Sequence, residues 1–226
     1  MGRINGITPA EISNRYPTII TPAGYAFSIW SLIYFGLVVF SIYQLLPGNL
    51  GRFSGTRTLY IASCVLNCAW IYFWHHDRIG ICFILIVALL AVLLTIAAKF
   101  SLSATYVEVF FVKGTFGLYA GWVTVAAIVN LFVYLRSTGT DLAGSVWAGV
   151  SAVLIATMLA IVVTRRFTNY FYSLAIAWAL TAIAIEQSGQ TLVVVACAAG
   201  VIVGLLMAMS FVLKLPTSPV RLRDNE

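Results

Sequence analysis

Charged side chains are scarce in this sequence. Only 9% of the 226 residues are Asp, Glu, Lys or Arg, whereas hydrophobic residues make up 62% and the mean hydropathy is +1.00. A water-soluble domain carries about 25% charged residues. The composition therefore excludes a soluble domain and indicates a chain whose solvent is the lipid bilayer.

Motifs of common enzymes are also missing. The sequence has no phosphate-binding glycine loop, no His-Glu-x-x-His pair and no nucleophile elbow. Lys113 and four acidic residues fall at or near the ends of apolar runs, which disfavours a proton-coupled transporter or a hydrolase with a buried acid; the four are Asp77, Glu108, Asp141 and Glu186. The adjacent His75 and His76 would point about 100° apart on a helix, so a shared metal ion is disfavoured. We predict a non-enzymatic protein with no catalytic residue and no metal site.

Long apolar runs dominate what is present. Crossing the hydrocarbon core takes about 20 helical residues, and backbone groups in lipid must be paired within the segment. We therefore expect an all-α integral membrane protein, a bundle of about seven transmembrane helices at 24–46, 57–76, 79–99, 110–135, 142–164, 168–187 and 190–214.

The distribution of basic residues predicts the orientation. Alternate loops on the side of the N-terminus hold 4 Lys and Arg residues, and the opposite side holds 9 of the 13. The positive-inside rule then places the N-terminus outside and the C-terminus in the cytoplasm. A polar segment at 1–23 precedes the first span, and a short basic tail at 215–226 follows the last. Membrane lipid is an expected partner and nucleic acid is not, while the host membrane is left open.

Aromatic and amide residues recur on one face of three spans. On a helix each set covers an arc of about 60–80°. The three stripes are Phe27, Trp30 and Tyr34; Asn67, Trp70 and Trp74; and Tyr119, Trp122, Ala126 and Asn130. Indole N–H groups and amides within a span need partners. Two interpretations stay open, namely polar contacts that hold helices together and an aromatic pocket for a small molecule.

The same stripes resemble motifs of the TspO family, the tryptophan-rich sensory or translocator proteins. The segment from Pro22 to Tyr34, with Phe27 and Trp30, is similar to the opening of the family's second helix. Asn67-Cys-Ala-Trp70 resembles a motif of its third helix, and Tyr119-x-x-Trp122-x-x-x-Ala126-x-x-x-Asn130 a motif of its fifth. The three motifs occur in the family's order and cover about 22–135.

This resemblance implies a pocket for porphyrins and other tetrapyrroles, or for sterols. A tetrapyrrole is thus the candidate cofactor, and in some members pocket tryptophans matching Trp30 and Trp122 support light-dependent porphyrin breakdown. The implied ligand-binding residues are aromatic walls, polar anchors and one small residue for clearance: Phe27, Trp30, Tyr34, Trp70, Tyr119 and Trp122; Asn67 and Asn130; and Ala126. The leading hypothesis is a membrane receptor or carrier for a flat hydrophobic ligand. The alternatives are a structural or assembly subunit of a larger, pigment-binding membrane complex and a small-molecule transporter.

The chain departs from the common pattern of the family in two respects. Three additional spans at 136–214 follow a TspO-like four-helix region at 24–135, and the family's first helix has no counterpart in residues 1–23. One wall of the pocket would then be missing. A later span of the chain, a second copy of it or another membrane subunit could cover this gap. We favour a protein partner, in a homo-oligomer or with another subunit, because Pro22 and the strip before it need a surface to lie on.

Overall fold

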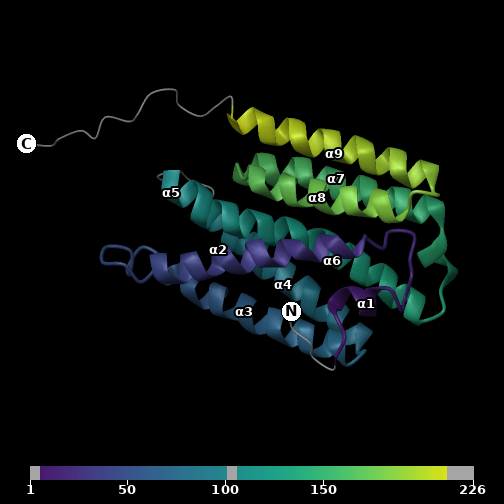
Figure 1. Cartoon of the computed structure of the whole chain (residues 1–226). Coiled ribbons are helices and arrows are strands. Elements are labelled where there is room, and N and C mark those ends of the chain that lie inside the picture. Colours follow the sequence, from purple (N-terminus) through teal and green to yellow (C-terminus); the bar gives the residue numbers. More distant parts are fainter. Residues whose placement is uncertain (1–5, 101–105, 213–226) are drawn as a thin grey trace, which may run out of the picture.

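Helices account for nearly all regular structure in this protein. The computed structural model describes residues 6–100 and 106–212, and within these ranges no strand occurs (Figure 1). The predicted basic tail at 215–226 lies outside the described residues. The elements are α1 (Pro9–Ser13), η1 (Gly24–Ser28), α2 (Ile29–Tyr43), α3 (Ser54–His75), α4 (Ile79–Lys99), α5 (Tyr106–Glu108), η2 (Val109–Gly114), α6 (Thr115–Ser137), η3 (Asp141–Gly144), α7 (Val146–Phe167), α8 (Tyr170–Glu186) and α9 (Thr191–Val212).

The seven long helices correspond to the seven predicted apolar runs. Five helical stretches are long and apolar enough to cross a membrane, namely Gly24–Tyr43, Ile79–Lys99, Val109–Ser137, Val146–Phe167 and Thr191–Ser210. Of the other two long helices, α8 is apolar but has only 17 residues, and the first turns of α3 are polar. Both lie alongside the other helices of the bundle (Figure 1). The protein is an all-α, multi-pass integral membrane protein, as the sequence predicts.

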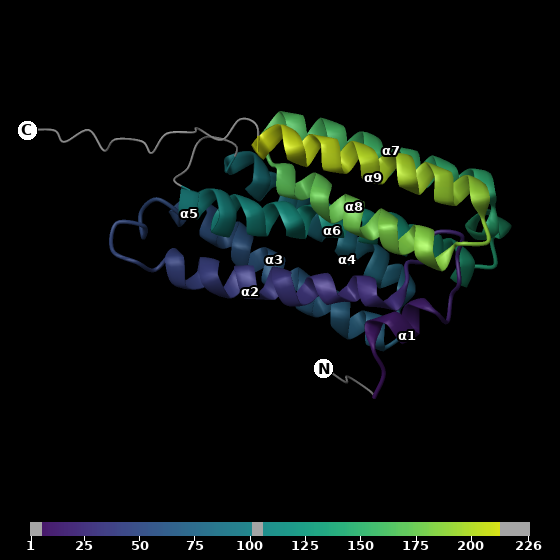
Figure 2. The same ribbon diagram turned by 45° about the horizontal axis from the view of Figure 1, so that its top comes forward.

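Helix α6 forms the centre of the bundle. It packs against α2 and α4 on one side and against α8 on the other (Figures 1 and 2). Helices α2, α3 and α4 form one group beside α6, and helices α7, α8 and α9, which pack on one another, form the second group. Because both groups contact α6, most of its side chains are buried, including Phe116, Val123 and Val133. Tyr119, Trp122 and Asn130 of α6 are buried and therefore face protein rather than lipid.

Two Gly-x-x-x-Gly pairs bring helices together around α8. A Cβ atom added to Gly121 of α6 would collide with the Tyr172 carbonyl oxygen of α8 and lie 2.9 Å from the Ala175 Cβ atom. On α9, a Cβ atom added to Gly204 would lie 3.0 Å from the Ser173 carbonyl oxygen, again on α8. Close backbone approach of this kind requires glycine. The pairs Gly117/Gly121 and Gly200/Gly204 thus let α6 and α9 pack closely on the two sides of α8.

Residues 9–23 form a strap across one end of the bundle. Its short helix α1 begins with a capping box made by Thr8 and Glu11. Hydrogen bonds tie the strap to helix ends: the Trp74 indole donates to the Pro9 carbonyl oxygen at 3.1 Å, the Tyr16 hydroxyl to Asp77 at 3.0 Å, and the Gln187 amide to the Thr21 carbonyl oxygen at 3.1 Å. Partial burial and the bond to Asp77 raise the pKa of Tyr16, so its phenol stays protonated and donating at neutral pH.

Candidate ligand-binding site

The three aromatic stripes converge between α2, α3 and α6. Trp30 is their common contact, since its ring lies 6.3 Å from Trp70, 5.7 Å from Tyr119 and 6.4 Å from Trp122, measured between ring centroids. Phe27 packs edge-on against Trp122 at 5.8 Å. Offset and edge-to-face pairs at these separations are favourable. The stripes therefore form one continuous aromatic cluster built from three helices.

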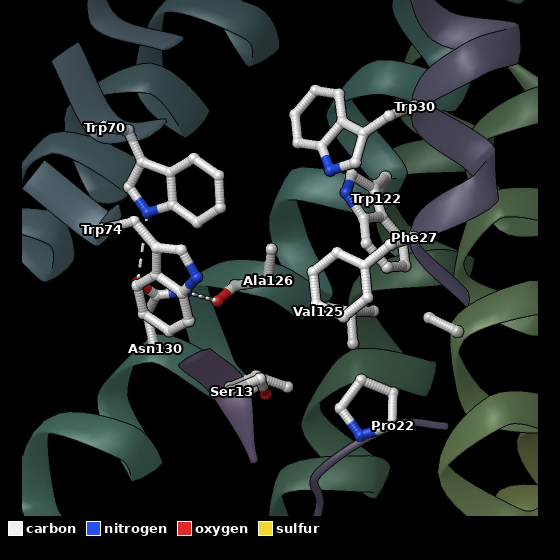
Figure 3. Close-up of a pocket in the computed structure, with 12 residues that line it drawn as sticks. Ser13, Pro22, Phe27, Trp30, Trp70, Trp74, Trp122, Val125, Ala126 and Asn130 are labelled. Atoms are coloured by element: carbon white, nitrogen blue, oxygen red, sulfur yellow. Dashed lines mark hydrogen bonds between the residues drawn. The ribbon is translucent and has the colours of Figure 1, made fainter. Parts of the chain in front are cut away.

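A small cavity lies within this cluster. Figure 3 shows Trp70 and Trp74 across the cavity from Trp30, Trp122 and Phe27, with Ala126 between them. The cavity has a volume of about 30 Å³, which is room for little more than water. Its walls come from the strap, η1, α2, α3, α6 and α8: Ser13, Pro22, Phe27, Trp30, Trp70, Trp74, Trp122, Val125, Ala126, Val129, Asn130 and Ala179.

Six of the nine predicted ligand-binding residues line this cavity: Phe27, Trp30, Trp70, Trp122, Ala126 and Asn130. The structure places the other three, Tyr34, Asn67 and Tyr119, one layer behind the wall. Tyr34 stacks on the outer face of Trp30 at 5.3 Å, and its hydroxyl accepts a hydrogen bond from the Asn67 amide at 3.1 Å. In this position the three residues hold the Trp30 ring in place.

Most polar groups around the cavity have partners within the bundle. The Trp70 indole donates to the Asn130 side-chain oxygen at 3.2 Å, and the Asn130 amide donates to the Ala126 carbonyl oxygen at 2.8 Å (Figure 3). These bonds fit the interpretation that amides hold helices together. Two groups on the wall differ: the Ser13 hydroxyl and the Trp122 indole N–H have no hydrogen-bond partner among the described residues, and the Trp122 side chain is only 4% exposed.

Comparison with known proteins gives the family. The chain matches the family model for TSPO-like proteins over residues 1–212. It belongs to the TSPO-like protein family. The match extends over the strap and α7 to α9 as well as over the region of the three motifs. Searches of curated proteins and of solved structures returned no match.

Helix α8 of this TSPO-like protein packs against η1 and the strap, where the sequence predicts a missing wall. The Trp178 ring packs edge-on against Tyr25 at 5.3 Å, and its indole donates to the Ala26 carbonyl oxygen at 3.0 Å. The Ala23 amide donates to the Ala182 carbonyl oxygen at 3.0 Å. These contacts are those expected of the first alternative, a later span of the same chain, which here covers Tyr25 and the strap. The preference for a protein partner stays a prediction.

Sequence reasoning missed several residues on the cavity wall. Trp74 lies on the second stripe and Pro22 opens the first motif, so both carried a usable signal. Ser13 and Ala179 carried none, since a small residue in a strap or an apolar helix has no distinguishing pattern. Their place in the site depends on how the strap and α8 pack, which spacing along the chain does not encode.

Proposed function

We propose that this TSPO-like protein is a membrane receptor or carrier that binds a flat hydrophobic ligand in the aromatic cavity. The observation that carries the proposal is the buried Trp122 indole N–H on the cavity wall, which has no acceptor among the described residues. A buried donor without a partner costs about 1–3 kcal/mol. A ligand that brings an acceptor to this position removes that cost.

The residues that line the cavity indicate which class of ligand it would bind. Five of the wall residues are aromatic rings, Phe27, Trp30, Trp70, Trp74 and Trp122, and the cavity lies inside the bundle away from charged side chains. Aromatic walls with few polar groups suit a planar apolar molecule. A tetrapyrrole with a carboxylate or carbonyl group has both the planar face and the acceptor, so it fits better than a sterol, which has no aromatic ring to stack.

Binding of such a ligand requires the cavity to open. Pockets for small molecules hold about 300–1,000 Å³, whereas this cavity holds about 30 Å³. A ligand ring stacked between the Trp30 and Trp70 rings would need a separation of about 7 Å, because each of its faces requires a contact distance of about 3.5 Å. The centroids of the two indole rings are only 6.3 Å apart. Ser13 and Pro22 close one end of the cavity from the strap. The cavity is therefore too small for such a ligand as it stands, and displacement of Ser13 and Pro22 with the strap would enlarge it.

Fluorescence titration with protoporphyrin tests the proposal. Protoporphyrin should quench tryptophan fluorescence of the purified protein saturably. Trp122→Phe keeps an aromatic wall but removes the indole N–H, and should weaken binding about tenfold, the value of one hydrogen bond to a charged acceptor. Trp147→Phe is the matched control, since Trp147 is 72% exposed on α7. Unchanged affinity in a folded Trp122→Phe protein would overturn the proposal, as would an equal loss in the control.

A further inference from the structure

The strap contributes a polar side chain to the wall of the aromatic cavity. Ser13, the last residue of α1, lines the cavity and is 2% exposed. Among the described residues of this wall, only Ser13 and Trp122 have a buried polar side-chain atom without a hydrogen-bond partner. Figure 3 shows Ser13 away from Trp122, which lies in the wall formed with Trp30 and Phe27. The cavity therefore has two separate unpartnered polar groups.

A serine hydroxyl on a helix often bonds to a carbonyl oxygen of its own helix. Ser41 of α2, for example, donates to the Leu37 carbonyl oxygen, four residues earlier, at 2.8 Å. Ser13 makes no such bond within the described chain. The corresponding oxygen, that of Pro9, accepts a hydrogen bond from the Trp74 indole at 3.1 Å instead. The Ser13 hydroxyl is thus available to a molecule in the cavity.

The strap that carries Ser13 is the part of the wall whose displacement would enlarge the cavity. It is attached to the bundle on both sides of Ser13, through the bond from Trp74 to Pro9 and the bond from Tyr16 to Asp77. These attachments limit how far Ser13 can move, so its hydroxyl stays at the edge of an enlarged cavity. A serine side chain has few rotamers to lose, and a hydrogen bond from it to a ligand therefore costs little conformational entropy.

The two unpartnered groups indicate which polar substituents the ligand carries. An indole N–H only donates, and a serine hydroxyl can donate as well as accept. An acceptor on the ligand can therefore pair with each of them, and two separate donors match two acceptors. A carboxylate is the stronger acceptor for such a donor, because hydrogen bonds to an ionised group are about twice as strong as those between neutral groups.

We infer that Ser13 is a specificity-determining residue that donates a hydrogen bond to a carboxylate of the ligand. This inference rests on the proposed function and narrows the ligand class to a flat apolar ring with two acceptor groups, one at Trp122 and one at the strap. The rest of the wall is aromatic or aliphatic apart from Asn130, whose side chain bonds to Trp70 and Ala126. Ser13 and Trp122 are therefore the groups that distinguish ligands by their polar substituents.

Quenching of tryptophan fluorescence in the purified full chain tests the inference with two porphyrins. Protoporphyrin carries two carboxylates, whereas etioporphyrin carries only alkyl groups on the same ring. Ser13→Ala should weaken protoporphyrin binding about tenfold, the value of one hydrogen bond to a charged acceptor, and should leave etioporphyrin binding unchanged. Asn14→Ala is the matched control, because Asn14 is the next residue of the strap, is exposed and does not line the cavity. This control should bind both porphyrins as the parent does.

Two further measurements separate a ligand contact from a structural role. Because the Ser13 hydroxyl has no partner among the described residues, Ser13→Ala should unfold at the same denaturant concentration as the parent or at a higher one. Unfolding at a lower concentration would assign the hydroxyl a structural role and overturn the inference. Bonds to two separate acceptors should add, so Ser13→Ala combined with Trp122→Phe should weaken protoporphyrin binding about a hundredfold.

The outcomes distinguish this inference from the proposed function. Unchanged protoporphyrin affinity in Ser13→Ala, while Trp122→Phe weakens binding, would overturn the inference and leave the proposed function standing. An equal loss for etioporphyrin, an equal loss in Asn14→Ala, or a double variant that binds no more weakly than either single variant would also overturn the inference. If etioporphyrin does not bind to the parent, the comparison of Ser13→Ala with Asn14→Ala decides alone. If protoporphyrin does not bind to the parent, the proposed function and the inference both fail.

Discussion

Ala126 lies between the two aromatic walls of the cavity (Figure 3). Leucine at this position adds three carbons to a space of about 30 Å³, so a ligand and the new side chain cannot both fit. Overpacking costs about 1–3 kcal/mol, and Ala126→Leu should therefore weaken protoporphyrin binding about tenfold or more. Ala91→Leu, on an exposed position of α4, is the matched control. Equal affinities in the two folded variants would show that ligand does not approach Ala126.

Asn130 connects α3 to α6 through its side chain. Its side-chain oxygen accepts a hydrogen bond from the Trp70 indole N–H, and its side-chain NH₂ group donates a hydrogen bond to the Ala126 carbonyl oxygen. Asn130→Leu leaves the Trp70 indole buried without an acceptor, which should lower the free energy of unfolding by about 1–3 kcal/mol. Thr95→Ala removes a hydrogen bond within one helix on an exposed face and should have little effect. Loss of helical circular dichroism during denaturation of the detergent-solubilised variants measures the difference.

At the residue scale, helical spacing predicted which residues share a face but not how far each lies from the cavity. Phe27 and Trp30 line the cavity, whereas Tyr34, on the same stripe, lies behind Trp30. The stripe from Phe27 to Tyr34 covers seven residues of helix length, about 10 Å at 1.5 Å per residue. A small cavity touches only part of that length, and its position depends on Pro22 and Ala179 from elements far along the chain.

At the scale of the helices, Gly121 sets the distance between α6 and α8. Even the smallest side chain there meets the Tyr172 carbonyl oxygen and the Ala175 Cβ atom. Gly121→Ala should push the helices apart and destabilise the protein by about 1–3 kcal/mol. Gly189→Ala, in a loop where an added Cβ atom meets nothing within 4 Å, should be neutral. If Gly121→Ala unfolds at the same denaturant concentration as the parent, the close contact is not required.

The apolar runs predicted the long helices well because length and hydropathy are local properties. The run expected at 110–135 is a helical stretch at Val109–Ser137, but it begins with the π-helix η2. A π-turn shifts the faces of the residues before it relative to a regular helix. The period of 3.6 residues therefore could not place Glu108 and Lys113, and their burial beside Arg52 became visible only in the folded chain.

At the scale of the whole molecule, the arrangement of helix groups was the least predictable feature. Three motifs located the aromatic cluster, but nothing in the spacing of α8 indicates that it covers η1 and the strap. Contacts between residues about 150 positions apart, such as Trp178 with Ala26, depend on how two groups pack on α6. Gly-x-x-x-Gly pairs such as those on α6 and α9 are typical of close helix packing, but their spacing does not identify the helix that they contact, here α8.

A crosslink between η1 and α8 tests whether the chain closes its own pocket. In a protein whose four native cysteines are replaced, a flexible bis-maleimide should join Tyr25→Cys to Trp178→Cys within one chain, because the two rings they replace are in contact, with centroids 5.3 Å apart. Tyr25→Cys with Trp147→Cys should not, since Trp147 is exposed on α7 and makes no ring contact with Tyr25 in the described chain. Mixing two differently tagged copies before the crosslinker is added distinguishes the arrangements. Crosslinked species that carry both tags would show that a second copy supplies the wall, whereas crosslinked monomer alone places α8 of the same chain over the strap.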